Sequence, residues 1–316
     1  MKHTTRWRDA VADALFRGVT QLAALTVLGL ILAILVVLTI KAWPAFHTFG
    51  WHFFSGTDWD PVSGTFSALT SIYGTVATSI VALVIALPVS FGIALFVTEL
   101  APTWLRRPVS TAVELLAAIP SIIYGMWGLF VFAPVFAQKV EPWMITHLGE
   151  LPLIGRIFQG IPIGIGVFTA GLILAIMVIP FITAVMRDVF EVVPAVLKES
   201  AYGLGCTTWE VMWNVVLPYT RVGVVGGVML GLGRALGETM AVTFVIGNSH
   251  DINMKLFLPG NTISSTLANE FTEAVGQLYT SSLIALGLIL FLVTFVVLAI
   301  AKLLLLRVAA REGAKT

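Results

Sequence analysis

The stretch that decides the fold is GVTQLAALTVLGLILAILVVLTI, residues 18–40, which carries no charged side chain. A helix needs about 20 apolar residues to cross the hydrocarbon core of a bilayer, and this run is long enough. Hydrophobic residues make up 58% of the 316-residue chain and charged residues only 11%, whereas soluble domains carry about 25% charged residues. The composition therefore predicts a membrane protein.

Six apolar runs of this kind occur along the chain. Because no water inside the bilayer can satisfy backbone groups, the spans should be helices, and the predicted fold class is all-α. The runs lie at 18–40, at 72–97, after Glu114, at 166–186, at 222–247 and after Glu273. A cleaved signal peptide is a poor description of the first run, which exceeds the about 7 to 15 residues of an h-region and has no small-residue cleavage site after it.

The distribution of Lys and Arg predicts the orientation. Six spans put both termini on one side, and most of the basic residues fall on that side: Lys2, Arg6, Arg8, Arg17, Arg106, Arg107, Arg187, Lys198, Arg221, Lys302, Arg307, Arg311 and Lys315. The opposite loops hold only Lys41, Lys139, Arg156 and Lys255. By the positive-inside rule we expect cytoplasmic N- and C-termini.

The cytoplasmic loop between the fourth and fifth spans is predicted to be a helix-turn-helix, residues 191–218. Pro194 suits a first helical position and Gly205 a C′ position, while Thr207 and Glu210 form a capping box for a second helix that Leu217-Pro218 should close. An apolar stripe on that helix should pack on something: Trp209, Met212, Trp213 and Val216. The loop is acidic, which is the wrong sign for binding the phosphate backbone of DNA, but a hairpin that caps its own bundle remains open.

The fifth run contains two opposite charges in GRALGETMAVTF, residues 233–244. A charge near the middle of a span costs about 2.5 to 3.5 kcal/mol, so Arg234 and Glu238 need partners. Four residues apart on one continuous helix, they would share a face and could neutralise each other or line a transport pathway. Glycines at small-xxx-small spacing predict close packing of this helix against its neighbours: Gly223, Gly227, Gly231, Gly233 and Gly237.

Little else in the chain suggests chemistry. The single cysteine, Cys206, excludes an internal disulfide and a thiolate metal cluster, and the five histidines have no metal-binding spacing. The chain has no G-x-x-x-x-G-K-[ST] loop, so we expect no cofactor in this chain, and any ATP and Mg would be used by a partner ATPase.

The loop carries a resemblance to a known family. Glu199-Ser200-Ala201, then Gly205, then Val215-x-Leu217-Pro218 resembles the E-A-A-x₃-G-x₉-I-x-L-P signature of ABC importer permeases, with Ser200 and Val215 as the departures. The stretches TDWDPVSG, TELAP, ELLAAIPSIIYGMWGLFVFAP and RALGETMAVTF narrow the resemblance to PstC-type permease subunits of phosphate-specific importers. PstA-type subunits are similar, but TDWDP and IYGMWG favour the PstC type.

The resemblance implies a type I importer permease (MetI-like) fold, with residues 1–316 as one transmembrane domain in a bacterial inner membrane. It implies that the first helix of loop 191–218 couples to a cytoplasmic ATPase through the signature residues Glu199, Ser200, Ala201, Gly205, Leu217 and Pro218. The implied partners are a PstA-like subunit in a heterodimer, two ATPase subunits, an extracytoplasmic phosphate-binding protein, phosphate and membrane lipid, without nucleic acid. Arg234 and Glu238 are the candidate residues of the substrate pathway.

Two other classes of function account for part of the sequence. An ion-coupled secondary transporter would explain the buried charges but leaves the cytoplasmic signature without a purpose. An intramembrane enzyme would need a nucleophile and base or metal ligands at membrane depth, which Glu238 alone does not supply. A permease for another oxyanion, such as arsenate, remains open because phosphate and arsenate have similar charge and shape.

Overall fold

The structure is a computed structural model that describes residues 3–152 and 155–313. In those ranges the regular secondary structure is helical, apart from two isolated bridge pairs in the loops, Asp60 with Thr65 and Gly247 with Gly260. Six segments are long and apolar enough to cross a membrane: Ala12–Phe49, Leu69–Leu100, Ser121–Leu148, Val167–Glu191, Thr208–Leu236 and Gln277–Leu303. The all-α fold with six spans is confirmed.

The centre of the bundle is α8 (Val167–Glu191), which packs against α3 (Leu69–Leu95) and α11 (Leu217–Leu236). Two thirds of its most apolar window is buried, more than in any other span among the described residues. Helix α3 continues into a π-helical turn, η1 (Phe96–Leu100). The third span combines α5 (Ser121–Trp127), η2 (Gly128–Phe132), α6 (Ala133–Val135), η3 (Phe136–Val140) and α7 (Glu141–Leu148).

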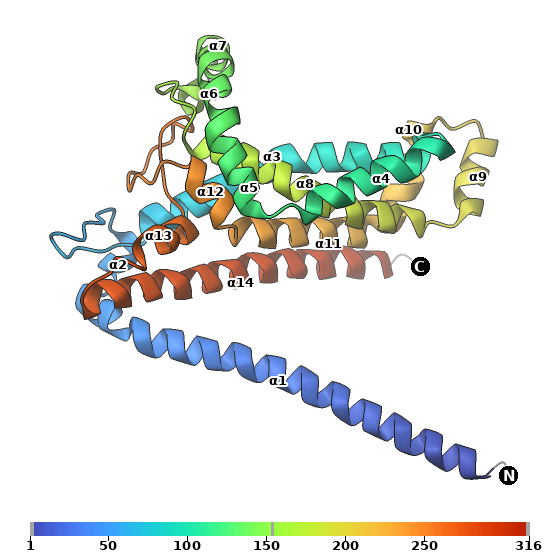
Figure 1. Cartoon of the computed structure of the whole chain (residues 1–316). Coiled ribbons are helices and arrows are strands. Elements are labelled where there is room, and N and C mark those ends of the chain that lie inside the picture. Colours follow the sequence, from blue (N-terminus) through green and yellow to red (C-terminus); the bar gives the residue numbers. More distant parts are fainter. Residues whose placement is uncertain (1–2, 153–154, 314–316) are drawn as a thin grey trace.

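The first and last spans form a pair that leaves the bundle on one side. Helix α14 (Gln277–Gly313) runs beside α11, whereas α1 (His3–Phe49) touches α14 near the loops and then diverges from it (Figure 1). The junction is held by Ser281, whose hydroxyl accepts from the Ala45 amide at 3.0 Å and donates to the Lys41 carbonyl at 2.9 Å. None of the most apolar window of α1 is buried, so its surface is available to lipid or another chain.

Short helices fill the connections. On the side of the α1–α14 junction lie α2 (His52–Ser55), α12 (Met240–Val245), α13 (Ile263–Glu270) and the 3₁₀ turn η4 (Gly155–Phe158) (Figure 1). On the other side lie α4 (Thr103–Ala118), α9 (Ala195–Gly203), α10 (Thr208–Val211) and the π-helical η5 (Met212–Val216). The two loop groups thus sit at opposite ends of the spans.

Three of the five glycines in the fifth run make the predicted close contact. A Cβ added to Gly223 or Gly231 would lie 2.6 Å from the side chain of Val189 or Ile182 in α8, and at Gly227 it would lie 3.1 Å from Val185. At Gly233 the nearest atom would be an ordinary 3.7 Å away, and at Gly237 only the chain's own carbonyl is near. The glycines therefore set the spacing of α11 on α8 but not on a second helix.

The prediction that Leu217-Pro218 closes the second loop helix is wrong. Helix α10 passes through η5 into α11 without a break, and Pro218 lies in the first turn of α11. A proline removes one amide donor and clashes with the carbonyl four residues earlier, and a π-helical turn relieves both problems because it re-registers the hydrogen bonds. The fifth span consequently starts at Thr208 rather than near residue 222.

Candidate functional site

Arg234 lies in the last turn of α11 and reaches across to α8. Its guanidinium carbon is 4.2 Å from the centroid of the Phe181 ring, which is the distance of a cation–π contact. Its Nε is buried and has no hydrogen-bond partner among the described residues. A guanidinium in a membrane span that is held by a ring face has most of its donors still to satisfy.

The prediction that Arg234 and Glu238 share one face of a continuous helix is wrong. Helix α11 ends at Leu236, and α12 begins at Met240, so Glu238 lies in the break between them. There its Oε1 accepts a hydrogen bond from the Ala241 amide at 3.3 Å, in the manner of an N-cap, and no ion pair joins it to Arg234. Exposed Gly237 interrupts the helix, and the carboxylate satisfies an amide that the new helix leaves unpaired.

Arg234 is one of the residues that line an open cavity of about 1190 Å³ between α8, α11 and α14. The cavity lining is apolar, with side chains such as Val185, Leu230 and Phe295, and the cations that line it in the described part are Arg234 and Lys302. Such a cavity attracts an anion by its charge and offers it few competing hydrogen bonds.

At the other end of the bundle, α9 ends as the sequence predicts. Gly205 has φ +89° and follows the last turn, the Cys206 amide donates to the Ala201 carbonyl at 3.2 Å, and the Gly205 amide donates to Tyr202 at 2.9 Å. This is a Schellman motif, which requires a left-handed residue. The capping box of Thr207 and Glu210 at the start of α10 is also confirmed.

The signature residues do not form one surface. Glu199, Ser200, Gly205 and Pro218 are exposed, whereas Leu217 is half-buried and Ala201 packs into the main apolar core. The exposed face of α9 also carries large apolar side chains, with Val196 70% and Leu204 86% exposed. Helix α9 thus combines an anchored side with an apolar side that nothing in the described chain covers.

Lys198 ties α9 to two spans. Its Nζ donates to Glu99 in η1, and this ion pair is well shielded from solvent. The same nitrogen is 3.4 Å from the Phe190 carbonyl near the end of α8. A displacement of α9 would therefore act on the ends of both spans.

The apolar stripe on the second loop helix is divided rather than packed as a whole. Met212 and Val216 are fully buried, but Trp209 and Trp213 are 60% and 56% exposed and stack on each other at 5.4 Å. The expectation that the stripe packs on something therefore holds within this chain for Met212 and Val216, whereas the two tryptophans lie on the side of the helix that is turned out of the bundle. Tryptophan rings favour the interface between lipid and water.

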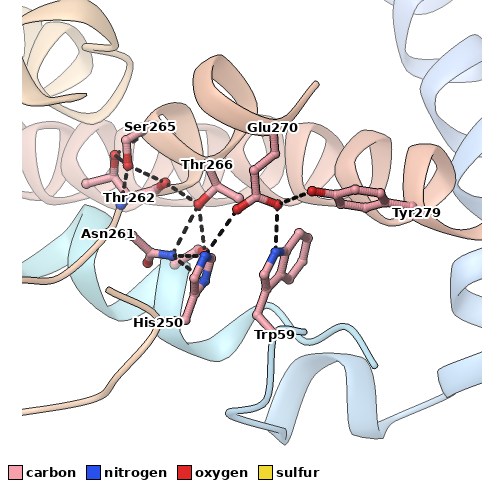
Figure 2. Close-up of polar contacts among 9 residues, drawn as sticks. Trp59, His250, Asn261, Thr262, Ser265, Thr266, Glu270 and Tyr279 are labelled. Carbon is pink, nitrogen blue, oxygen red and sulfur yellow. Dashed lines mark hydrogen bonds and ion pairs between the residues drawn. The ribbon is translucent and has the colours of Figure 1, made fainter. Parts of the chain in front are cut away.

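A polar cluster that the sequence did not reveal joins the loops at the opposite end (Figure 2). The Glu270 carboxylate accepts from Trp59 Nε1 and from the Tyr279 hydroxyl, both at 2.7 Å, and it lies 3.2 Å from His250 Nε2. Asn261 donates to His250 Nδ1 at 2.6 Å, which leaves the Nε2 proton for Glu270. The cluster thus links the TDWDP loop, α13 and α14. Of its members, Trp59 alone stands in a stretch that the sequence marks, the TDWDP motif.

Hydrogen bonding controls the charge of Glu270. Burial is the largest single influence and raises the pKa of its carboxyl, but the hydrogen bonds from His250, Tyr279 and Trp59 together outweigh it and hold the pKa below its usual value. The carboxylate is therefore ionised at neutral pH and serves as a shared acceptor.

The chain matches a known family of transport proteins. A family model described as "Binding-protein-dependent transport system inner membrane component" matches residues 86–310, well over half of the chain. The chain belongs to this family. It is a multi-pass membrane component of a transport system, and its last four spans, loop 191–218 and Arg234 lie within the matched region.

Curated relatives match this permease over nearly its whole length. It is 59% identical over 99% of its length to the "Phosphate transport system permease protein PstC" of Pasteurella multocida, covering 97% of that protein. It is 58% identical to the protein of the same name from Mesorhizobium japonicum, with 97% and 94% of the two chains covered. The protein of that name from Haemophilus influenzae is 55% identical, with 95% of both chains covered. The resemblance to PstC-type permeases is confirmed.

Solved structures confirm the fold of the permease. A bacterial ABC transporter that imports alginate matches with TM-score 0.58 and 18% identity, covering 95% of this chain and 98% of that chain. An inward-facing form of the MetNI methionine ABC transporter matches with TM-score 0.56 and 16% identity, covering 79% and 99%. At these identities the likeness concerns the fold, which is that of ABC importer permeases.

Proposed function

We propose that the chain is the permease subunit of an ATP-driven importer and carries inorganic phosphate across the inner membrane. The observation that carries this proposal is Arg234, a cation in a membrane span that lines a cavity and has no carboxylate partner among the described residues. Relatives that share 58–59% of their residues with this chain are phosphate transport permeases by name, which supports phosphate as the substrate.

Guanidinium chemistry suits this substrate. A guanidinium offers paired donors that match two oxygens of a phosphate. A transport site must also release its anion, and two cations in an otherwise apolar cavity bind less tightly than a dense cluster of donors would. Glu238 lies four residues further along the chain, and its negative charge limits how tightly the anion is held.

Helix α9 supplies the coupling to a separate ATPase. Its exposed apolar side chains and Glu199 form the docking surface, and the turn at Gly205 fixes the direction in which α10 leaves. Lys198 transmits the movement of α9 to η1 and α8 through Glu99 and the Phe190 carbonyl. ATP and Mg are used by the ATPase and not by this chain.

The complete importer contains a PstA-like permease subunit, two ATPase subunits and an extracytoplasmic phosphate-binding protein. The N- and C-termini and α9 face the cytoplasm, while the loops joined by Glu270 face outward and receive the binding protein. An ion-coupled secondary transporter or a permease for another oxyanion is the alternative.

Reconstitution of the importer into vesicles tests the proposal. We expect uptake of radiolabelled phosphate only when the ATPase, ATP and the binding protein are all present, and no ATP hydrolysis by the purified chain alone. Uptake driven by an ion gradient without the ATPase would favour a secondary transporter. Preference for arsenate at equal loading of the binding protein would assign another oxyanion.

A further inference from the structure

Phe181 meets Arg234 because the glycines bring two helices together. Gly231 lies against Ile182 so closely that a Cβ would be 2.6 Å from that side chain. Arg234 is about one helical turn further along α11, which places its guanidinium over the neighbouring ring of Phe181 at 4.2 Å. Phe181 is half-buried and follows Pro180 inside α8.

A ring and a carboxylate hold a guanidinium in different ways. A carboxylate takes two of the in-plane N–H donors and neutralises the charge. A ring attracts the cation through its face and leaves the in-plane donors free. Glu238 is engaged at the start of α12, so the ring of Phe181 is the contact that fixes the orientation of Arg234.

We propose that Phe181 is a positioning residue for phosphate translocation, whose ring holds the Arg234 guanidinium beside the cavity without competing with the anion. This inference rests on the proposed role of Arg234. A purely structural ring would fill space in the bundle and would be replaceable by any apolar side chain of similar size.

The test uses the whole importer in vesicles, with ATP on the side of the membrane that holds the ATPase and with radiolabelled phosphate bound to the binding protein. The readout is labelled phosphate transported per ATP hydrolysed, because the label separates transported phosphate from the product of hydrolysis. The variants are Phe181→Leu, Phe181→Met and Phe181→Tyr. Phe132→Leu is the matched control, since Phe132 is also half-buried and packs against the rings of Trp127 and Phe136 and against the core.

We expect Phe181→Leu and Phe181→Met to lower phosphate transported per ATP by about five-fold, as loss of a partly desolvated cation–π contact predicts. Complex yield and stimulation of ATP hydrolysis by the binding protein should stay near the wild-type level. Phe181→Tyr, which keeps the ring face, and Phe132→Leu should both transport normally.

Normal transport per ATP by Phe181→Leu and Phe181→Met would overturn the inference. An equal loss in Phe181→Tyr and Phe181→Leu would also overturn it, because the ring face would then not be the feature that matters. Arg234→Gln separates this inference from the proposed function. If Arg234→Gln abolishes uptake while Phe181→Leu is normal, only the role of Phe181 fails, whereas normal uptake by Arg234→Gln removes the proposed role of Arg234 itself.

Discussion

Arg234 and Glu238 belong to two different helices, although only three residues separate them in the sequence. Arg234 ends α11 and lies over Phe181, while Glu238 accepts from the Ala241 amide at the start of α12. The two charges therefore have separate structural partners, and neutralising one should not leave the other as the unpaired half of an ion pair.

Close packing of α11 on α8 can be tested with two glycines. Gly231→Ala should destabilise the complex by about 1–3 kcal/mol, because its Cβ would lie 2.6 Å from Ile182 in a packed core. Gly226→Ala is the control, since no atom lies within 4 Å of its Cβ position and alanine favours the helix. Thermal unfolding of the purified complex should separate the two, and equal midpoints would contradict the packing.

Two variants distinguish the effect of the turn at Gly205 from the effect of a bulky side chain on α9. Gly205→Arg should abolish ATP-driven uptake, because a residue with φ +89° resists a side chain by roughly 1–2 kcal/mol and the direction of α10 would change. Gly203→Arg puts the same side chain into open space on α9 without a positive φ. Equal uptake by the two variants, at equal membrane insertion, would remove the role of the turn.

The docking charge on α9 is tested by Glu199→Lys. The exposed carboxylate makes no hydrogen bond to the described chain, so the variant should insert normally. Less ATPase should copurify with it, and ATP-driven uptake should be lost. Glu191→Lys reverses an exposed charge at the end of α8 and should have a smaller effect. Full ATPase recovery and uptake with Glu199→Lys would leave the loop as bundle packing.

The Glu270 cluster should stabilise the outer loops in a pH-dependent manner. Folding lowers the pKa of the Glu270 carboxyl. Its contribution to the free energy of unfolding is therefore fully present above the pKa of about 4.3 that it has in the unfolded chain, and it is lost as the pH falls through the lower pKa of the folded state. Glu270→Gln should cost about 1–3 kcal/mol at pH 7 and flatten this acid dependence. Exposed Glu273→Gln is the control, and an unchanged acid dependence in Glu270→Gln would contradict the assignment.

The sequence predicts the spans and the loop ends well because their causes are local. Apolar length gives the six spans, a glycine gives the Schellman motif at Gly205, and side-chain spacing gives the capping box at Thr207. These features depend on a few neighbouring residues, so no tertiary information is needed.

The predictions that failed depend on tertiary contacts or on local adjustments of the helices. Pro218 does not end a helix because the π-helical turn η5 before it accommodates the missing amide donor. The break after Leu236 could not be predicted from Gly237, because glycine is common in membrane helices. Phe181 and Glu270 act on partners that are distant in sequence, so no local pattern marks them. The pathway and coupling roles of the site residues stay predictions.

Uptake of radiolabelled phosphate by an importer that contains Arg234→Gln tests the central claim most directly. The account predicts that uptake is abolished while complex yield and stimulation of ATP hydrolysis by the binding protein persist, and that Glu238→Gln impairs uptake without abolishing it. Because the two residues are not paired, Arg234→Gln combined with Glu238→Gln should remain inactive. Full uptake by Arg234→Gln, or recovery of uptake in the double variant, would contradict the account.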